Sequence, residues 1–301
     1  MTSVDLSYPE VSVVIPVYNE ADRLQDVLEA LQRQDYPSNL YEVIVVDNGS
    51  TDRSPEVARS MEDVRLLFET EKLGSPYSAR NRGIEAASGA VIALVDSSCR
   101  PVHRWLRSGI ETMCHSNGDL LGGNVEFEYG GDVTPAKIFD ALSNVKMKEY
   151  VEERRVATTG NLFVRREVFE ARGLFPEGIR SGGDLRWTKG ATQNGWKLVY
   201  GPQATVCYPA RSLGPLLRKQ FRVAKGQPNI WREAGTDSVP VRILKHLLKP
   251  ISVQRVKDKI ERRGDVFMYD YLWHVWLVHY VVKVVMTAGR VYGLLSPTVN
   301  E

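Results

Sequence analysis

The first hundred residues alternate between short apolar runs and longer segments in which apolar residues recur every three or four positions. The run VSVVIPV at 11–17 is β-branched and nearly continuous, which is typical of a strand that is covered on both faces. The segment that follows predicts a helix with Asn19 as its capping residue. The buried face of this helix is predicted to hold Leu24, Val27, Leu28 and Leu31.

The same alternation of strand and helix patterns continues along the chain. Strands are predicted at 43–47, 64–68 and 90–95, and helices from Ser54 and over 75–89. This order implies right-handed crossovers between parallel strands. We therefore predict an α/β fold, a doubly wound and mostly parallel sheet flanked by helices, with a helical extension in the C-terminal third.

Polar residues follow three of the predicted strands. Tyr18, Asn19 and Glu20 come after the first strand, Asp47 ends the second, and Asp96 follows the last. Sheets of this kind bind their ligands at the carboxyl ends of the strands. Any one of these aspartates could equally be a turn or cap residue. Because the three strand ends meet at one edge, a binding site is the favoured interpretation.

The side chains at that edge limit the chemistry. Ionised Asp47 accepts hydrogen bonds only, so it can receive the N3 proton of uracil but gains nothing from cytosine there. Arg80 offers donors for a base carbonyl or a phosphate oxygen, although it could also be a surface arginine. Asp96 suits a divalent cation such as Mg²⁺ or Mn²⁺. Neither a P-loop nor a GxGxxG opens the sheet, which disfavours ATP hydrolysis and dinucleotide redox chemistry.

Four motifs in this order resemble glycosyltransferase family 2, and the resemblance extends over about residues 10–226. They are VSVVIPVYNE (11–20), VIVVDNGSTD (43–52), GSPYSARNRG (74–83) and VIALVDSSCRP (91–101). The resemblance implies the GT-A fold and transfer of a sugar from a nucleotide-diphosphate donor with inversion. It also assigns nucleotide-sugar contacts: Pro16, Tyr18 and Glu20 line the nucleoside, Asp47 and Arg80 hold the base, and Asp96 opens the DxD-type metal motif.

Two departures from the family pattern concern the metal. The usual Asp-x-Asp is Asp96-Ser97-Ser98 in this chain, and Tyr208 stands where the family often has a histidine. One carboxylate, together with the donor diphosphate and water, can still hold Mg²⁺ or Mn²⁺. We therefore expect a weakly held divalent cation at Asp96, and metal-independent donor binding stays open.

The resemblance also places the catalytic base. Inverting transfer needs one carboxylate that takes the proton of the acceptor hydroxyl. The family commonly uses the aspartate of a Glu-Asp pair, and the matching residue is Asp184, which could instead only cap the helix that begins at Leu185. Candidates for stabilising the leaving diphosphate are Arg218, Arg222 and Lys225, with a solvated helix face as the alternative.

The charge of the chain is unevenly distributed. Among its 301 residues, 43% are hydrophobic and 25% are charged, as in ordinary globular proteins. Residues 1–210 hold 23 Lys and Arg against 30 Asp and Glu, whereas residues 211–263 hold 14 against 4. The later segment therefore favours an anionic surface or substrate, which we interpret as a membrane rather than a nucleic acid.

The C-terminal third supports that interpretation. Residues 244–263 form a basic amphipathic pattern, and residues 271–282 are rich in Trp and Tyr. The aromatic run is shorter than a spanning helix, so we expect it to lie in the membrane interface. A tilted span that reaches 295, or packing on the protein's own core or on a second subunit, stays open.

Three widely spaced cysteines, Cys99, Cys114 and Cys207, predict a reducing compartment. No signal-peptide pattern opens the chain, so we expect a protein at the cytoplasmic face of the membrane. We predict a nucleotide-sugar-binding half at 1–98, an acceptor-binding and catalytic half at 99–226, and a membrane-associating extension at 227–301. The predicted function is transfer from a UDP-sugar to a hydroxyl of a lipid-linked or polysaccharide acceptor. The alternative is a non-catalytic sugar-nucleotide-binding or membrane scaffold protein.

Overall fold

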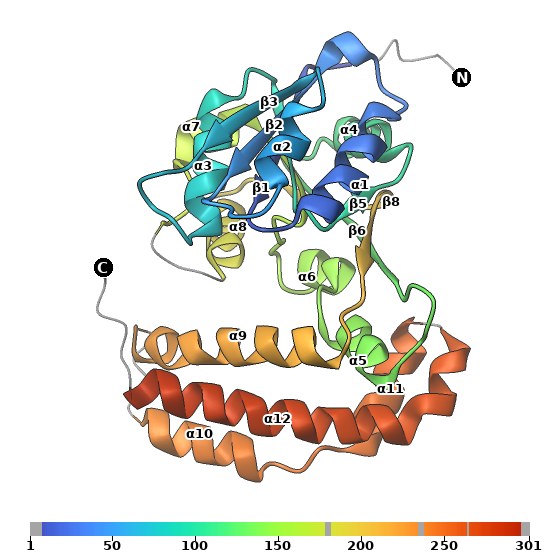
Figure 1. The fold of residues 1–301 in the computed structure, drawn as a ribbon, viewed down its shortest axis with the longest axis vertical. Helices are drawn as coiled ribbons and strands as arrows, with labels where there is room; N and C mark the ends of the chain where they lie inside the picture. Colours follow the sequence, from blue (N-terminus) through green and yellow to red (C-terminus); the bar gives the residue numbers. More distant parts are fainter. Residues whose placement is uncertain (1–7, 178–181, 234–237, 264, 296–301) are drawn as a thin grey trace. The chain divides into compact units, whose positions relative to one another are not determined.

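The structure, a computed structural model, describes residues 8–177, 182–233, 238–263 and 265–295. The chain forms two compact units (Figure 1). The sheet unit comprises Met1–Glu126 and Val145–Tyr208, and the helical unit comprises Phe127–Asn144 and Pro209–Glu301. The predicted functional boundaries at 98 and 226 stay a prediction, because they concern donor and acceptor binding rather than compactness.

Four parallel strands form the first half of the sheet. They are β1 (Val11–Val17), β2 (Tyr41–Asp47), β3 (Val64–Phe68) and β4 (Val91–Val95), in the order β3-β2-β1-β4. This order confirms the predicted doubly wound arrangement. The helices between these strands are α1 (Ala21–Gln32), the short 3-10 helix η1 (Ser38–Leu40), α2 (Ser54–Arg59) and α3 (Pro76–Ala86).

Helix α3 packs very closely against the sheet. A Cβ atom on Gly83 would lie 2.4 Å from Val14 Cγ1 and 3.1 Å from Val46 Cγ2. Only glycine therefore lets the helix backbone approach β1 and β2 at this point. The approach matters for the site, since α3 also carries Arg80.

The second half of the sheet contains antiparallel pairs. β7 (Asn161–Arg165) pairs with β4 and with β6 (Leu120–Glu128), and β5 (Arg100–Pro101) pairs with β8 (Leu198–Pro209). The full order is β3-β2-β1-β4-β7-β6-β8-β5, so the sheet is mixed. The sequence pattern had assigned none of these later strands. The accompanying helices of the sheet unit are α4 (Trp105–Ser116), α6 (Met147–Glu152), α7 (Arg166–Arg172) and α8 (Gly183–Gln193).

The predicted capping role of Asn19 is wrong. The N-cap of α1 is Glu20, whose side chain makes no capping hydrogen bond, and the Ala21 amide donates to Asp52 Oδ2 at 3.1 Å. Asn19 adopts a left-handed conformation with φ 51°, and its Oδ1 accepts the Thr51 amide at 2.7 Å. The loop after β2 therefore supplies the cap, which a pattern of neighbouring residues does not reveal.

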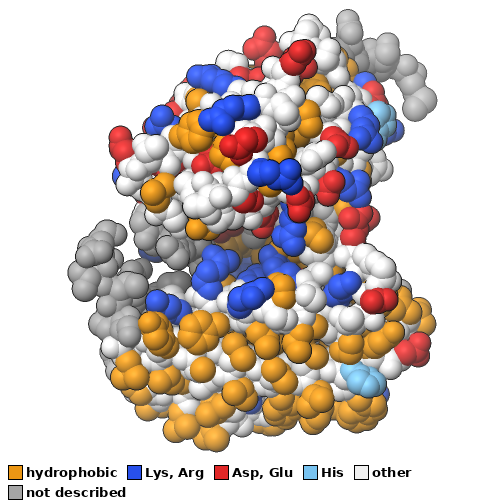
Figure 2. All heavy atoms as spheres, in the orientation of Figure 1, with side chains coloured by type: hydrophobic (Ala, Val, Ile, Leu, Met, Phe, Trp, Pro, Cys, Tyr) orange, Lys and Arg blue, Asp and Glu red, His pale blue; other side chains and the backbone are white. Residues whose placement is uncertain are grey.

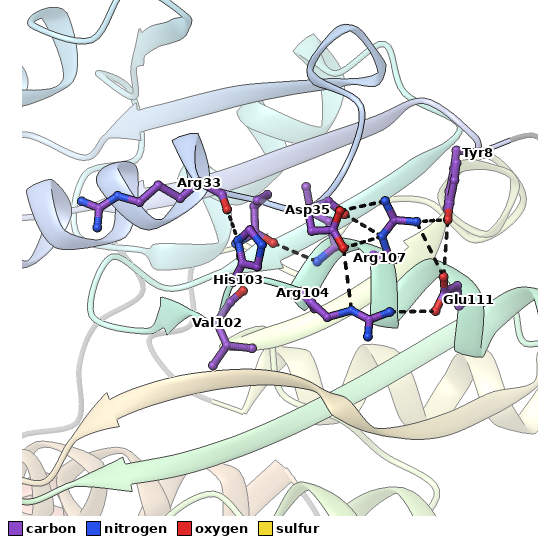
Figure 3. Close-up of polar contacts among 10 residues, drawn as sticks. Tyr8, Arg33, Asp35, Val102, His103, Arg104, Arg107 and Glu111 are labelled. Atoms are coloured by element: carbon purple, nitrogen blue, oxygen red, sulfur yellow. Dashed lines mark hydrogen bonds and ion pairs between the residues drawn. The ribbon is translucent and has the colours of Figure 1, made fainter.

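A polar network ties the end of α1 to α4 (Figure 3). The Arg107 guanidinium pairs with Asp35 at 2.8 Å and lies 5.0 Å from the centre of the Tyr8 ring. Arg104 bridges Asp35 and Glu111, at 3.8 and 3.9 Å. The hydrogen bond from Arg107 lowers the pKa of Asp35. Because Tyr8 precedes β1, this network lies at the opposite edge of the sheet from the carboxyl ends of the strands.

The described residues of the helical unit form five helices and one short 3-10 helix. They are α5 (Pro135–Ser143), α9 (Leu213–Glu233), α10 (Val239–Leu248), α11 (Val253–Arg263), η2 (Val266–Tyr271) and α12 (Leu272–Leu295). The predicted basic segment 244–263 thus spans the end of α10 and all of α11, and Pro250 lies in the break between them. The core of the helical unit is formed mainly by Phe139, Leu216, Val256, Ile260 and Val275.

Candidate functional site

The predicted nucleotide residues lie at the carboxyl ends of adjacent strands. Asp47 at the end of β2 pairs in register with Val17 at the end of β1. Pro16 lies one residue earlier in β1, Tyr18 follows it with 57% of its surface exposed, and β4 on the other side of β1 leads into Asp96. Sheets of this type bind ligands at this edge.

Asp47 keeps one oxygen without a partner. The residue is 2% exposed, and its Oδ2 accepts the amides of Gly49 and Ser50 at 3.1 and 3.0 Å. Its buried Oδ1 accepts no hydrogen bond from the described residues. An unsatisfied buried oxygen is costly, so this arrangement suits a ligand that brings a donor.

Arg80 contacts Asp96. Its Nη2 lies 2.5 Å from Asp96 Oδ1, and its Nη1 donates to the Pro76 carbonyl at 3.1 Å. The buried Nε of Arg80 has no partner among the described residues. The structure therefore places Arg80 on Asp96 and not on Asp47, and the predicted contact of Arg80 with a base stays a prediction.

Asp184 lies in the first turn of α8. The cap of this helix is Gly182 and not Asp184, so a purely capping role does not account for the aspartate. Tyr77 Oη donates to Asp184 Oδ1 at 3.1 Å and accepts the Gly183 amide at 2.9 Å. The Thr159 amide donates to Asp184 Oδ2 at 3.3 Å. Both carboxylate oxygens are therefore held in a defined orientation.

Tyr77 is the functional candidate that the sequence analysis missed. Its side chain is 3% exposed, and burial together with the neighbouring Asp184 carboxylate raises the pKa of its hydroxyl. The hydroxyl therefore stays protonated and available as a donor. The available signal was the spacing: Tyr77 lies three residues before Arg80 on α3, and residues three apart share one face of a helix.

Asp96 and Asp184 border the same turn. The Thr159 amide contacts Asp184, and a Cβ atom on the adjacent Gly160 would lie 3.4 Å from Asp96 Oδ2. Glu20 also reaches this edge, since its Oε2 accepts the Ser97 hydroxyl at 3.0 Å. The turn before β7 thus brings together carboxylates that are far apart in the sequence.

The described residues offer little to a metal ion. No group of three or more His, Cys, Asp or Glu among them could hold a metal. One carboxylate oxygen of Asp96 is paired with Arg80, and Ser98 stands where the family motif has a second carboxylate. Mg²⁺ can be held by one or two carboxylates with substrate phosphates. Asp96 therefore fits a divalent cation as a single protein ligand that depends on the donor's phosphates.

The proposed leaving-group residues belong to the helical unit. Arg218, Arg222 and Lys225 lie on α9 at spacings of four and three, which places them on one face of the helix. The ammonium group of Lys225 lies 4.8 Å from the centre of the Tyr292 ring. Their role toward a diphosphate stays a prediction.

Comparison with known proteins identifies the family. The family model described as glycosyl transferase family 2 matches residues 12–173, which is more than half of the chain. Glycosyltransferase AglE of Haloferax volcanii is 48% identical over 227 residues, or 74% of each chain. The chain is a member of glycosyltransferase family 2. The predicted family and enzyme class are therefore confirmed.

Two further proteins resemble this transferase. Dolichyl N-acetyl-alpha-D-glucosaminyl phosphate 3-beta-D-2,3-diacetamido-2,3-dideoxy-beta-D-glucuronosyltransferase of Methanococcus voltae is 24% identical over 235 residues, covering 72% of this chain and 73% of its own. A mannosyltransferase from Pyrobaculum calidifontis, solved with GDP-mannose and Mn²⁺, superposes with a TM-score of 0.65 at 18% identity. The match covers 96% of the transferase and 88% of that structure, and it shows the shared GT-A fold.

Proposed function

We propose that the transferase moves a sugar from a UDP-sugar to a hydroxyl of a lipid-linked or polysaccharide acceptor, with inversion at the anomeric carbon. The observation that carries this proposal is the common turn at Thr159 and Gly160. It places the candidate base, Asp184, beside the candidate diphosphate or metal residue, Asp96. Family membership supplies the reaction class.

The unpartnered oxygen of Asp47 supports a uridine donor. Uracil presents one N–H on its pairing edge, and a carboxylate oxygen can accept it. Cytosine and adenine present an acceptor nitrogen at the corresponding position and would leave the oxygen unsatisfied. Guanine also presents N–H groups, so a GDP-sugar is the competing donor, as bound by the Pyrobaculum calidifontis enzyme.

The held carboxylate of Asp184 supports single-displacement chemistry. As the acceptor oxygen attacks the anomeric carbon, Asp184 takes its proton. The bond between the anomeric carbon and the diphosphate oxygen breaks, and its electron pair leaves with the nucleoside diphosphate. One base and one displacement invert the configuration, and the chain needs no second carboxylate for this step.

Positive charge near the diphosphate would stabilise the departing group. Arg80 supplies a cation beside Asp96, at 2.5 Å. A divalent cation held by Asp96 would neutralise further charge on the phosphates when it is bound. Arg218, Arg222 and Lys225 are proposed for the same purpose.

Two further observations support the proposed acceptor and cellular location. The Methanococcus voltae relative is named for a dolichyl phosphate-linked acceptor. The basic segment 211–263 would be attracted to anionic lipid headgroups. We therefore propose a peripheral membrane enzyme, and the three widely spaced cysteines favour the cytoplasmic face.

Donor turnover tests the enzyme against the non-catalytic alternative. UDP-sugars and GDP-sugars are offered with Mn²⁺, nucleotide release is measured, and the anomeric configuration of the product is read by NMR. We expect UDP release that falls about 10²–10⁴-fold in Asp184→Asn, with donor binding retained. The matched control is Asp26→Asn, because Asp26 is an exposed aspartate on α1.

Three outcomes would contradict parts of the proposal. Release of GDP alone would show that the donor is a GDP-sugar and not a UDP-sugar. A product that keeps the anomeric configuration of the donor would exclude the inverting mechanism. Tight nucleotide-sugar binding with no release under any metal would favour the scaffold.

A further inference from the structure

One face of α12 is apolar and uncovered. Its exposed side chains recur every three or four residues along the whole helix. They are Trp273, Leu277, Val281, Val284, Ala288, Val291 and Leu295. Exposure reaches 64% at Trp273 and 76% at Leu295. Soluble monomers rarely leave so long an apolar stripe in water, so this face is expected to bind another apolar surface.

The opposite face of α12 is fixed to α9. A Cβ atom on Gly289 would lie 2.7 Å from the Phe221 carbonyl, and one on Gly293 would lie 2.0 Å from the Lys225 carbonyl. The two helix backbones therefore touch at these glycines. Along the same face, Val275 and Val282 are buried in the core of the unit. The exposed stripe lies on the other side of the helix.

Helix α10 widens the apolar surface and adds charge. α9, α12 and α10 lie side by side, and Figure 2 shows hydrophobic side chains gathered over α10 and α12. Val241, Leu244 and Leu248 are exposed on α10 at spacings of three and four. Lys245 and Lys249 are exposed on the same helix and at its end.

We infer that the exposed face of α10 and α12 docks on an anionic lipid bilayer, with α12 lying in the plane of the membrane interface rather than crossing it. The inference specifies the membrane partner of the proposed function. Its test measures lipid binding and not sugar transfer, so the two can fail separately.

Charge favours a bilayer over a second copy of the chain. Residues 211–263 carry 14 basic against 4 acidic side chains, and a second copy would bring the same excess to the interface. Anionic headgroups instead complement Lys245 and Lys249, while the apolar side chains enter the boundary region. Trp273 and Tyr292 are exposed on α12, and such residues prefer the headgroup level.

Charge also decides the orientation of α12. The segment Val266–Leu295 is long and apolar enough to span a bilayer by length and composition alone. However, α9 runs against α12 and carries Arg218, Arg222 and Lys225. Because Phe221 lies against Gly289, a spanning α12 would take the neighbouring Arg218 and Arg222 to hydrocarbon depth, where charged groups are strongly disfavoured. With α12 in the plane, they stay in water.

Vesicle flotation of the full chain tests the inference. Vesicles of phosphatidylcholine alone are compared with vesicles that also contain phosphatidylglycerol. We expect the protein to float with the anionic vesicles and to be released by alkaline carbonate. The double variant Leu277→Glu and Val284→Glu is expected to lower the bound fraction at least about tenfold. The matched control is Leu73→Glu, because Leu73 in the sheet unit is as exposed as Leu277, at 59%.

A second variant protects the test against misfolding. Lys245→Gln with Lys249→Gln leaves the apolar face intact and is expected to reduce flotation most at low salt. Absence of flotation by the unaltered protein would overturn the inference, and retention through carbonate would overturn the in-plane orientation. A dimer that Leu277→Glu dissociates, without lipid binding, would assign the face to a second copy instead.

Discussion

The hydroxyl of Tyr77 offers a sharp test of how Asp184 is held. Tyr77→Phe removes the donor to Asp184 Oδ1 and the acceptor of the Gly183 amide. The ring itself stays, so its packing 6.0 Å from the Phe175 ring is kept. A hydrogen bond to a charged group contributes about 1.5–3 kcal/mol. Since about 1.4 kcal/mol is tenfold in rate, kcat is expected to fall about 10- to 100-fold.

Steady-state kinetics of sugar transfer measures this effect. Because Tyr77 contacts the proposed base and not the strand end at Asp47, the KM for the donor is expected to change less than about threefold. Tyr41→Phe is the control, since it also removes a hydrogen-bonded tyrosine hydroxyl, which donates to the Leu31 carbonyl at 2.9 Å. Tyr41 begins β2 at the other edge of the sheet. An unchanged kcat in Tyr77→Phe, or an equal loss in Tyr41→Phe, would refute the reasoning.

Three further predictions concern nucleotide binding, the metal ion and the pH dependence of stability. Asp47→Asn is expected to weaken binding of UDP about 10- to 100-fold in calorimetry, and an unchanged Kd would remove Asp47 from the nucleotide site. EDTA is expected to slow UDP release, with recovery only at high Mn²⁺ because Asp96 is a single ligand; full activity in EDTA would exclude the cation. Burial, with Lys259 nearby, lowers the pKa of His279 to about 4, so the unfolded chain binds the proton first as pH falls. The free energy of unfolding should drop by about 2 kcal/mol between pH 7.5 and pH 5 in denaturant titrations, and equal drops in His279→Leu would contradict this.

Local patterns predicted the first half of the sheet well. The strands at 11–17 and 64–68 have the predicted bounds. For 11–17 the reason is clear, because a nearly continuous β-branched run has few other ways to bury itself. The strands at 120–128, 161–165 and 198–209 were not assigned. Their pairing partners lie far away in the chain, so no short-range pattern identifies them.

The candidate site also contains residues that the sequence predicted and contacts that only the structure revealed. Asp47 and Asp96 follow apolar strands, so the rule for strand ends placed them at one edge. The contact between Tyr77 and Asp184 joins residues 107 positions apart, and only the folded chain brings them together. Asn19 shows the reverse case, since a plausible local cap was replaced by Asp52 from another loop.

The amino-acid sequence by itself determined the parallel half of the sheet, the carboxylates at its edge and the basic character of the C-terminal third, because each depends on neighbouring residues. Tertiary structure alone decided that Tyr77 and the Thr159 amide hold Asp184, and which side of α12 stays uncovered. These features depend on which distant segments pack together, and α12 exposes one apolar side because α9 occupies the other.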